Sequence, residues 1–304
     1  MRKGLWIVSL SLLLSATALA APVGFRSLKI EPGVTASGMG YAYTAVADDP
    51  SALYWNPAGL TRNAPGQSAL LTHTEWIFDQ RMEYAAFVWN RGEDAFGAGI
   101  SGFYLGGIER RDEDPLAEPL GDFGAYDIVV TAAYARVVGP FRLGLAAKPF
   151  YTKIDRVSAH GVALDLGAQW EAPLRGLVLG GAVANLGNEP NYIDEPFSLP
   201  VDLRGGAAYQ IGLGERDASL LVAAEARKIQ EEDTRFHVGA DLRIGEVASF
   251  RVGYKLGYDE EESEEESYSF GFGLSRDFYS IQYAVVPFSS AAGTVHRFGI
   301  GFRR

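Results

Sequence analysis

Apolar residues alternate with small or polar residues along most of this 304-residue chain, and this pattern limits the possible folds more than any other feature. Between residues 126 and 134, for example, Tyr126, Ile128 and Val130 share one face and Asp127 lies on the other. The pattern recurs at 162–170, 201–210 and 236–243. Because successive side chains of a strand point to opposite faces of a sheet, it predicts an all-β protein.

Segments of this kind predict about 14 strands, an even number of roughly ten-residue strands as in bacterial outer-membrane barrels. They are expected at 68–74, 81–90, 94–104, 124–137, 141–153, 157–171, 176–186, 199–211, 217–228, 233–244, 247–258, 267–276, 278–287 and 293–303.

A soluble sandwich and a membrane barrel both produce such alternation. Two features favour the barrel. The faces opposite the apolar ones are small or charged with both signs, which suits a wet or filled lumen. Aromatic residues also stand at the ends of the apolar faces, as interfacial girdles require; these are Tyr126, Tyr134, Trp170, Tyr209 and Tyr279. The sequence therefore predicts a single antiparallel transmembrane β-barrel.

The connections between the predicted strands alternate in length. Those after even-numbered strands are short, as at 91–93 and 139–140, and those after odd-numbered strands are mostly longer and acidic, with Asp155-Arg156 as the exception. Outer-membrane barrels have short periplasmic turns and long extracellular loops. We therefore expect both termini in the periplasm and an N-terminal segment that enters the barrel from that side.

The chain begins with the features of a secretory signal. Arg2 and Lys3 precede an apolar run at 5–14, and Ala18-Leu19-Ala20 supplies the small residues of a cleavage site. Cleavage is expected after Ala20, which implies export. The net charge of −11 argues against a nucleic-acid partner, and the absence of cysteine excludes disulfides.

Residues 33–60 do not follow the strand pattern. Asp49 is expected to cap a helix that begins at Pro50, and Pro57 should end this helix at about Trp55. Gly59 offers a left-handed exit. The segment is too apolar for a free tail, so we expect a partly helical plug inside the lumen with Asn56-Pro57-Ala58 at its upper bend. A surface loop in front of an ordinary β domain is the alternative.

The run GMGYAYTAVADDPSALYWNPAGL in this segment resembles the N-terminal signature of the PorV/PorQ family of outer-membrane proteins, which is related to the FadL-type long-chain fatty-acid transporters. The region from about Glu225 to Phe302 is similar to the same family. In FadL-type barrels the corresponding segment is a lumen plug, and an early strand is kinked to open the wall sideways. The resulting division is a signal peptide at 1–20, a plug at 21–66 and an outer-membrane barrel at 67–304.

The candidate site residues follow from this arrangement. The plug and ligand residues are Gly38, Gly40, Asp48, Asp49, Asn56, Pro57 and Ala58. Lumen charges expected to face them are Arg204, Arg235, His237, Asp241, Arg243 and Arg251, with the arginines available to Asp48 and Asp49. His237 is expected to hold a structural hydrogen bond. By resemblance, Gly97, Gly99 and Gly102 mark the wall kink; close packing against the plug is the equal alternative.

The sequence does not match the motifs of enzymes or cofactor-binding sites that we considered. Gly38-Met39-Gly40 lacks the later glycine of a dinucleotide loop and no strand precedes it, and the four histidines lack the spacing of a zinc site. The acidic run 259–266 lacks the ligand spacing of a calcium loop, so a solvated loop is expected. No catalytic residue, metal or cofactor is predicted.

The predicted function is binding or transport of a small hydrophobic ligand in the outer membrane of a Gram-negative type cell. The resemblance implies capture at the extracellular side, a shift of the plug, and lateral or periplasmic release. The alternative, also implied by resemblance, is a PorV-like component of a protein secretion system that carries cargo or acts as a scaffold. The expected partners are membrane lipid, a hydrophobic small molecule, and secretion proteins or secreted cargo.

Overall fold

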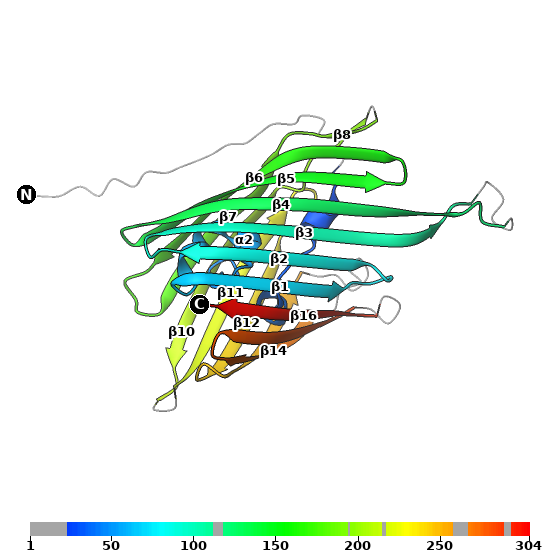
Figure 1. Ribbon diagram of the computed structural model, residues 1–304. Coiled ribbons are helices and arrows are strands. Elements are labelled where there is room, and N and C mark those ends of the chain that lie inside the picture. Colours follow the sequence, from blue (N-terminus) through cyan, green and yellow to red (C-terminus); the bar gives the residue numbers. More distant parts are fainter. Residues whose placement is uncertain (1–22, 112–117, 194, 215–216, 258–266, 289–292) are drawn as a thin grey trace, which may run out of the picture.

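The computed structural model describes residues 23–111, 118–193, 195–214, 217–257, 267–288 and 293–304. The predicted signal peptide and the acidic run 259–266 lie outside the described residues. Fourteen strands form a closed antiparallel barrel in which neighbours in sequence pair and β1 closes the barrel on β16 (Figure 1). The predicted all-β barrel is confirmed.

All fourteen predicted strands are present, with small changes at their ends. They are β1 (Gly66–Glu75), β2 (Arg81–Asn90), β3 (Asp94–Glu109), β4 (Asp122–Val138), β5 (Phe141–Ile154), β6 (Val157–Glu171), β7 (Leu177–Gly187), β10 (Asp202–Gly212), β11 (Ala218–Ile229), β12 (Arg235–Ile244), β13 (Ala248–Leu256), β14 (Tyr268–Arg276), β15 (Tyr279–Pro287) and β16 (Thr294–Arg303). The connection between β7 and β10 contains a two-stranded sheet that the sequence did not indicate, formed by β8 (Asn191–Tyr192) and β9 (Glu195–Pro196).

The alternation in the sequence separates the outside of the barrel from its inside. On β6, Leu164 and Leu166 are 50% and 54% exposed, whereas Asp165 between them is 1% exposed. The apolar face thus points outward and the charged residue inward. This is the reverse of a soluble protein and suits a wall surrounded by hydrocarbon. Within the described residues, no helix is long and apolar enough to cross a membrane.

The two ends of the barrel differ. We call the end with the tight turns at 91–93, 139–140 and 245–247 the turn end, and the opposite end, with the connection 188–201, the loop end. In Figure 1 the turn end lies to the left, beside the C-terminus, and the loop end to the right.

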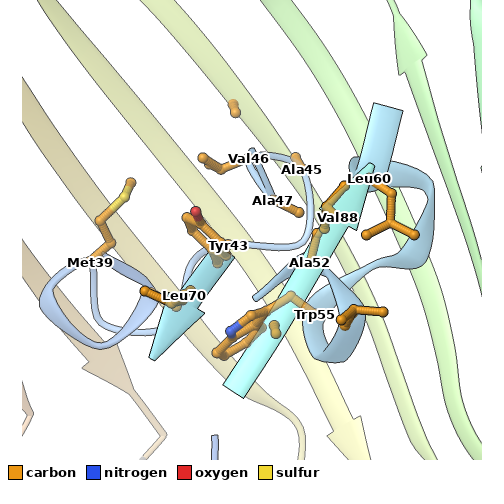
Figure 2. Close-up of a cluster of buried hydrophobic side chains, with 14 of the residues drawn as sticks. Met39, Tyr43, Ala45, Val46, Ala47, Ala52, Trp55, Leu60, Leu70 and Val88 are labelled. Atoms are coloured by element: carbon orange, nitrogen blue, oxygen red, sulfur yellow. The ribbon is translucent and has the colours of Figure 1, made fainter. Parts of the chain in front are cut away.

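Residues 23–65, here called the inner segment, fill the barrel. Its elements are η1 (Arg26–Lys29), α1 (Val34–Gly38), α2 (Ala52–Trp55) and η2 (Pro57–Arg62). Tyr43 and Trp55 are fully buried although the barrel has no core of its own. Their cluster extends to the inward-facing Leu70 on β1 and Val88 on β2 (Figure 2). The inner segment is therefore the core of the molecule, with the barrel wall as its container.

The path of the inner segment differs from the prediction. Val23 forms a parallel bridge with Ser198 in the β7–β10 connection, so the first described residues lie at the loop end. The chain then descends and joins β1 at the turn end. The expectation that the segment enters from the side of the short turns was wrong, because strand parity places the start of β1 but not the residues before it.

Local details of the inner segment also differ. Asn56 is extended and ends α2 at Trp55, as predicted. The helix begins at Ala52 rather than Pro50, with Ser51 at its N-cap. Gly59 does not provide a left-handed exit, since it lies within η2. A Cβ atom on Gly59 would lie 2.1 Å from the carbonyl oxygen of Ala47, so close approach of two backbones explains this glycine.

Candidate functional site: the filled lumen and the wall beside it

The inner segment touches the barrel wall through backbone as well as side chains. On β13, a Cβ atom at Gly253 would lie 1.9 Å from the backbone nitrogen of Gly40. On β6, a Cβ atom at Gly167 would lie 2.1 Å from Asn56 Oδ1. Gly38 packs in the same way on Gly271 of β14. Glycine permits this approach, and residues 34–60 are therefore fitted closely to the wall.

Asn56 is the polar anchor of this fit. Its Nδ2 donates to the carbonyl oxygens of Thr44 (2.9 Å), Ala168 (3.2 Å) and Gly181 (3.4 Å), and its Oδ1 accepts from the backbone N–H of Ala58 (3.1 Å). One side chain thus joins two parts of the inner segment to β6 and β7. The bend at Asn56-Pro57-Ala58 exists, but it packs on Gly144 and Gly167 near the turn end rather than forming an upper bend.

A buried charge cluster holds the loop-end part of the inner segment. Asp202 Oδ2 accepts from Arg204 Nη2 at 2.6 Å and from Arg227 Nη2 at 2.8 Å, and Arg227 also pairs with Glu31. Arg204 Nη1 donates to the carbonyl oxygen of Trp55 at 3.2 Å and its guanidinium lies over that ring at 4.9 Å. Burial raises the pKa of Glu31, but the Arg227 guanidinium outweighs it and leaves the pKa below the usual 4.5.

A second cluster lies toward the turn end. Asp48 Oδ2 accepts from Arg243 Nη2 at 3.1 Å, and Arg243 Nε donates to Asp241 Oδ2 at 2.8 Å. Arg251 Nε lies 3.5 Å from Asp241 Oδ1. Burial raises the pKa of Asp48, but the nearby Arg243 and Arg62 and the hydroxyl of Tyr43 together bring it below its usual value. Asp49 instead accepts from the N–H and hydroxyl of Ser51, and burial raises its pKa.

The outcome for the predicted lumen charges is mixed. Arg243 binds Asp48 as expected, and His237 donates from Nδ1 to the carbonyl oxygen of Gly40 at 2.8 Å, the structural role predicted. Arg204 and Arg251 pair with Asp202 and Asp241 rather than with the two acids of the inner segment.

Arg235 lies 3.3 Å from Glu232 at the loop end and so does not reach those acids either. Sequence reasoning missed Glu31, Arg227 and Glu225. Glu225 Oε2 accepts from the backbone N–H groups of Tyr43 and Thr44 at 3.0 and 2.7 Å. For Arg227 and Glu225, their inward positions on β11 were the available signal; Glu31 lies outside the strands and had none.

A gap remains between the inner segment and the wall in the loop-end half of the lumen. Its volume is about 30 Å³, and it lies against β2, β3, β4 and β5. Leu28, Ile30 and Pro32 of the inner segment cover it, with Leu53 and Tyr54 beneath. Its wall side is formed by Met82, Tyr84, Ser101, Phe103, Asp127, Val129, Thr131 and Lys148. This volume holds about one water molecule, so a larger guest requires movement of the covering residues.

A groove of about 400 Å³ lies on the outer, membrane-facing surface of the same wall. Its outward lining is mainly apolar and includes Leu71, Ala85, Ile100, Tyr104, Ile128, Phe298 and Ile300. Tyr84 and Ser101, which are register partners on β2 and β3, line both the outer groove and the inner gap. The two spaces are thus separated by the backbone of these two strands.

The predicted kink at Gly97, Gly99 and Gly102 is absent. The β2–β3 register runs unbroken from Arg81–Tyr104 to Asn90–Ala95, and the irregularity in β3 lies between Leu105 and Ile108. Gly97 and Gly99 contact Leu53 of the inner segment, which confirms the close-packing alternative for these two. Gly102 faces outward beneath the ring of Tyr104, on the floor of the outer groove.

The turn end holds a third space, a polar cavity of about 420 Å³. Asp48, Asp49, Arg243 and Arg251 line it, together with Ser249. No group of three or more histidine, aspartate or glutamate side chains among the described residues is arranged to hold a metal ion. The lumen therefore has a small, partly apolar gap on one side of the fitted inner segment and a charged cavity on the other.

Comparison with solved structures finds barrels whose fold is similar to that of this chain. The barrel is similar to the CymD monoaromatic hydrocarbon channel, with a TM-score of 0.68 and 12% identity over 90% of this chain and 98% of that one. It is also similar to the toluene transporter TbuX of Ralstonia pickettii, with a TM-score of 0.61 and 14% identity over 90% and 98% of the two chains. The closed 14-strand barrel of this chain thus has a fold similar to that of these two proteins.

The sequence comparisons match the first half of the chain. Residues 14–153 fit an uncharacterised protein family, UPF0164. A UPF0164 protein of Treponema pallidum (strain Nichols) is 28% identical over 197 residues, which are 57% of this chain and 48% of that protein. The chain thus spans about half the length of this relative. The resemblance to the PorV/PorQ family stays a prediction.

Proposed function

We propose that the protein carries a small hydrophobic molecule across an outer membrane, from the loop end into the lumen gap and then sideways through the wall between β2 and β3. The observation that carries this proposal is that the apolar gap and the apolar outer groove lie back to back across Tyr84 and Ser101. The similarity of the fold to channels named for toluene and monoaromatic hydrocarbons supports the same class of ligand.

The remaining routes are less suitable for such a ligand. The path to the turn end passes the backbone contact of Gly40 with Gly253 and the contact of the Asn56 side chain with Gly167. Beyond them lies the cavity lined by Asp48, Arg243 and Arg251. Transfer of an apolar molecule into a charged, hydrated space gains nothing, whereas the outer groove opens to hydrocarbon. Lateral release therefore needs movement of the cover at residues 28–32 and local separation of β2 and β3, with residues 34–60 in place.

A reversible cross-link across the two strands tests this route. The chain contains no cysteine, so Tyr84→Cys with Ser101→Cys introduces a single pair on neighbouring strands. Oxidation should abolish toluene uptake by proteoliposomes, and reduction should restore it. Ala208→Cys with Ala223→Cys, a buried inward-facing pair on β10 and β11, is the matched control and should transport in both states. Uptake that is unaffected by the β2–β3 disulfide would exclude this route.

A second candidate function is favoured by the close filling of the lumen. Asn56 and the Asp202 cluster anchor the inner segment to the barrel. A barrel filled in this way is rigid, and it could serve as a binding partner for another protein as well as a transporter. In this alternative the protein is a PorV-like component of a secretion system. Cross-linking in native membranes that recovers a secreted protein or secretion component, together with no ligand uptake, would favour it.

A further inference from the structure

The outer groove carries a hydrogen-bonded histidine–glutamate pair on its membrane-facing surface. His73 of β1 and Glu83 of β2 are register partners, and both side chains point outward, 39% and 54% exposed. His73 Nδ1 lies 2.7 Å from Glu83 Oε1. A carboxylate accepts and does not donate, so the imidazole N–H is the donor. Neither side chain contacts the inner segment, because both lie on the outside of the wall.

His73 lies two residues before the end of β1 and Glu83 two residues after the start of β2, so the pair stands near the loop-end rim of the wall. Both residues line the groove beside Leu71, Ile100 and Ile300, which are 58%, 47% and 58% exposed. A charged side chain on the lipid-facing surface of a barrel is unfavourable, increasingly so toward the midplane. The cost is small near the rim, where this pair lies. The pair therefore places a hydrogen-bonding group at the loop-end edge of an apolar groove.

We propose that the outer groove selects molecules that combine an apolar body with one hydrogen-bond donor, a hydroxyl or an amine. This inference rests on the proposed function, and its occupant is the transported molecule rather than a membrane lipid. The apolar lining takes the body of the molecule, with the rings of Tyr104 and Phe298 suited to an aromatic one. The carboxylate of Glu83 accepts the donor, since two oxygens give it acceptor capacity beyond the bond from His73.

The surrounding charges sharpen the selection. Glu75 Oε1 lies 3.9 Å from His73 Nε2, so a second carboxylate stands near the same imidazole. A ligand with its own carboxylate meets like charge here and is disfavoured. A bare hydrocarbon fills the groove but makes no hydrogen bond to Glu83. In low-dielectric surroundings a hydrogen bond to a charged group is stronger than in water, so a donor on the ligand is favoured.

The inner gap has the same mixed character. Its lining pairs the apolar side chains of Leu28, Met82 and Phe103 with the hydroxyl of Ser101 and the carboxylate of Asp127. A molecule with one donor thus finds an acceptor on both sides of the wall. A pure hydrocarbon finds one on neither.

Uptake of matched aromatic compounds by proteoliposomes of phosphatidylglycerol tests the proposal. Toluene, p-cresol and p-toluate share one ring and differ in the polar group. We expect the wild type to take up p-cresol about tenfold faster than toluene, the scale set by one hydrogen bond to a charged group, and to exclude p-toluate. Glu83→Leu should bring the ratio of the p-cresol rate to the toluene rate down to about one. Glu109→Leu, an exposed carboxylate of β3 that does not line the groove, should keep the preference.

The outcomes separate the two proposals. If no variant takes up any of the three compounds while the barrel migrates as folded in unheated electrophoresis, the proposed function fails. If toluene and p-cresol enter equally in the wild type, or if Glu83→Leu keeps the preference, transport stands and the selection fails. Native mass spectrometry provides the third readout. A phosphatidylethanolamine retained by the wild type and lost in Glu83→Leu would identify a lipid as the occupant and overturn the assignment.

Discussion

Asn56 of the inner segment and Gly167 of β6 occupy neighbouring space so closely that a Cβ atom on the glycine would lie 2.1 Å from Asn56 Oδ1. Gly167 thus has no room for a side chain, although it lies on an inward face of small residues. The absence of a side chain at this wall position is part of how the inner segment is seated.

The first prediction compares two glycines of the wall. Gly167→Ala should destabilise the barrel by about 1–3 kcal/mol, because the added methyl group is forced against the inner segment. The change would appear as a lower midpoint in urea unfolding. Gly205→Ala on β10 is the matched control, since a Cβ atom there meets nothing within 4 Å. Equal stability of the two variants would mean that the inner segment is not seated on β6.

A second prediction concerns the lipid-facing surface. Leu166 is 54% exposed at mid-strand, where arginine costs about 2–4 kcal/mol near the bilayer midplane. Leu166→Arg should therefore reduce the folded fraction in membranes. Gly167→Arg is unsuitable as the lumen control, because Asn56 fills that space. Ser275→Arg, which faces the turn-end cavity, replaces it. Full tolerance of arginine at Leu166 would indicate a surface in water.

Much of the barrel can be predicted from the sequence, because the alternation of inward and outward side chains along a strand depends only on neighbouring residues. The alternation on β4 and β6 gives the outward faces, and tight turns such as Gly139-Pro140 give the order of the wall. Parity also separates Gly97 and Gly99, which face the inner segment, from Gly102, which faces outward. The grouping of these three glycines as one kink overlooked this signal.

The arrangement inside the barrel does not follow from local sequence. Glu31 and Arg227 meet across 196 positions of the chain, and their contact depends on how far each strand is shifted relative to the next around the closed barrel. The path of residues 23–32 is decided by such contacts, since Phe25 stacks on Phe150 at 4.6 Å. In each of these pairs, the sequence around one residue contains no pattern that identifies the other. The pairing of Asp202 with two arginines could not be predicted from the sequence for the same reason.

Acid stability provides a third prediction through Asp48. Burial raises its pKa, but Arg243, Arg62 and the hydroxyl of Tyr43 together hold the pKa in the folded protein below the usual 3.8. A carboxyl group with a depressed pKa stabilises the fold above the unfolded pKa and loses this contribution as the pH falls through the folded value. The wild type should therefore lose more stability than Asp48→Asn between about pH 5 and pH 2.

The measurement is the urea midpoint of both proteins across this range, with Asp277→Asn at an exposed turn as the control. Asp49 has the opposite shift, because burial raises its pKa, so only the difference between wild type and variant isolates Asp48. The urea midpoints of the wild type and Asp48→Asn could instead differ by the same amount from pH 5 to pH 2. That result would show that the pair with Arg243 does not hold the carboxylate ionised.

The fourth prediction assigns the ends of the barrel. Ile193 in the β7–β10 connection is 76% exposed, and Glu246 at a tight turn has a side chain that is 88% exposed. Ile193→Cys should react with an impermeant maleimide on intact cells, and Glu246→Cys only after the outer membrane is broken. Ser198, in the same connection, is only 8% exposed and serves as a buried control. The reverse labelling pattern would invert the proposed orientation.

The last prediction concerns the closure of the lumen by the inner segment. Residues 34–60 separate the apolar gap at the loop end from the polar cavity at the turn end, and no backbone of the wall lies between these spaces. Replacement of Gly33 to Leu60 by a short Gly-Ser linker should leave a barrel that inserts and conducts ions in a planar bilayer, whereas the full chain should be nearly closed. Asn56→Ala should give intermediate conductance, because it removes the bonds that hold the segment to Ala168 and Gly181.

The matched control for Asn56→Ala is Asn191→Ala, an exposed asparagine of the loop-end hairpin that should stay as closed as the wild type. Loss of the Asn56 side chain leaves the carbonyl oxygen of Thr44 with the bonds from Gln169 alone, so the segment should be loosened rather than expelled. The decisive case is the linker variant. Its heat-dependent electrophoretic mobility shows whether this variant is folded. If it is folded and passes no current, then the side chains of Arg204, Arg227 and their partners close the lumen without the inner segment, and residues 33–60 are not a plug.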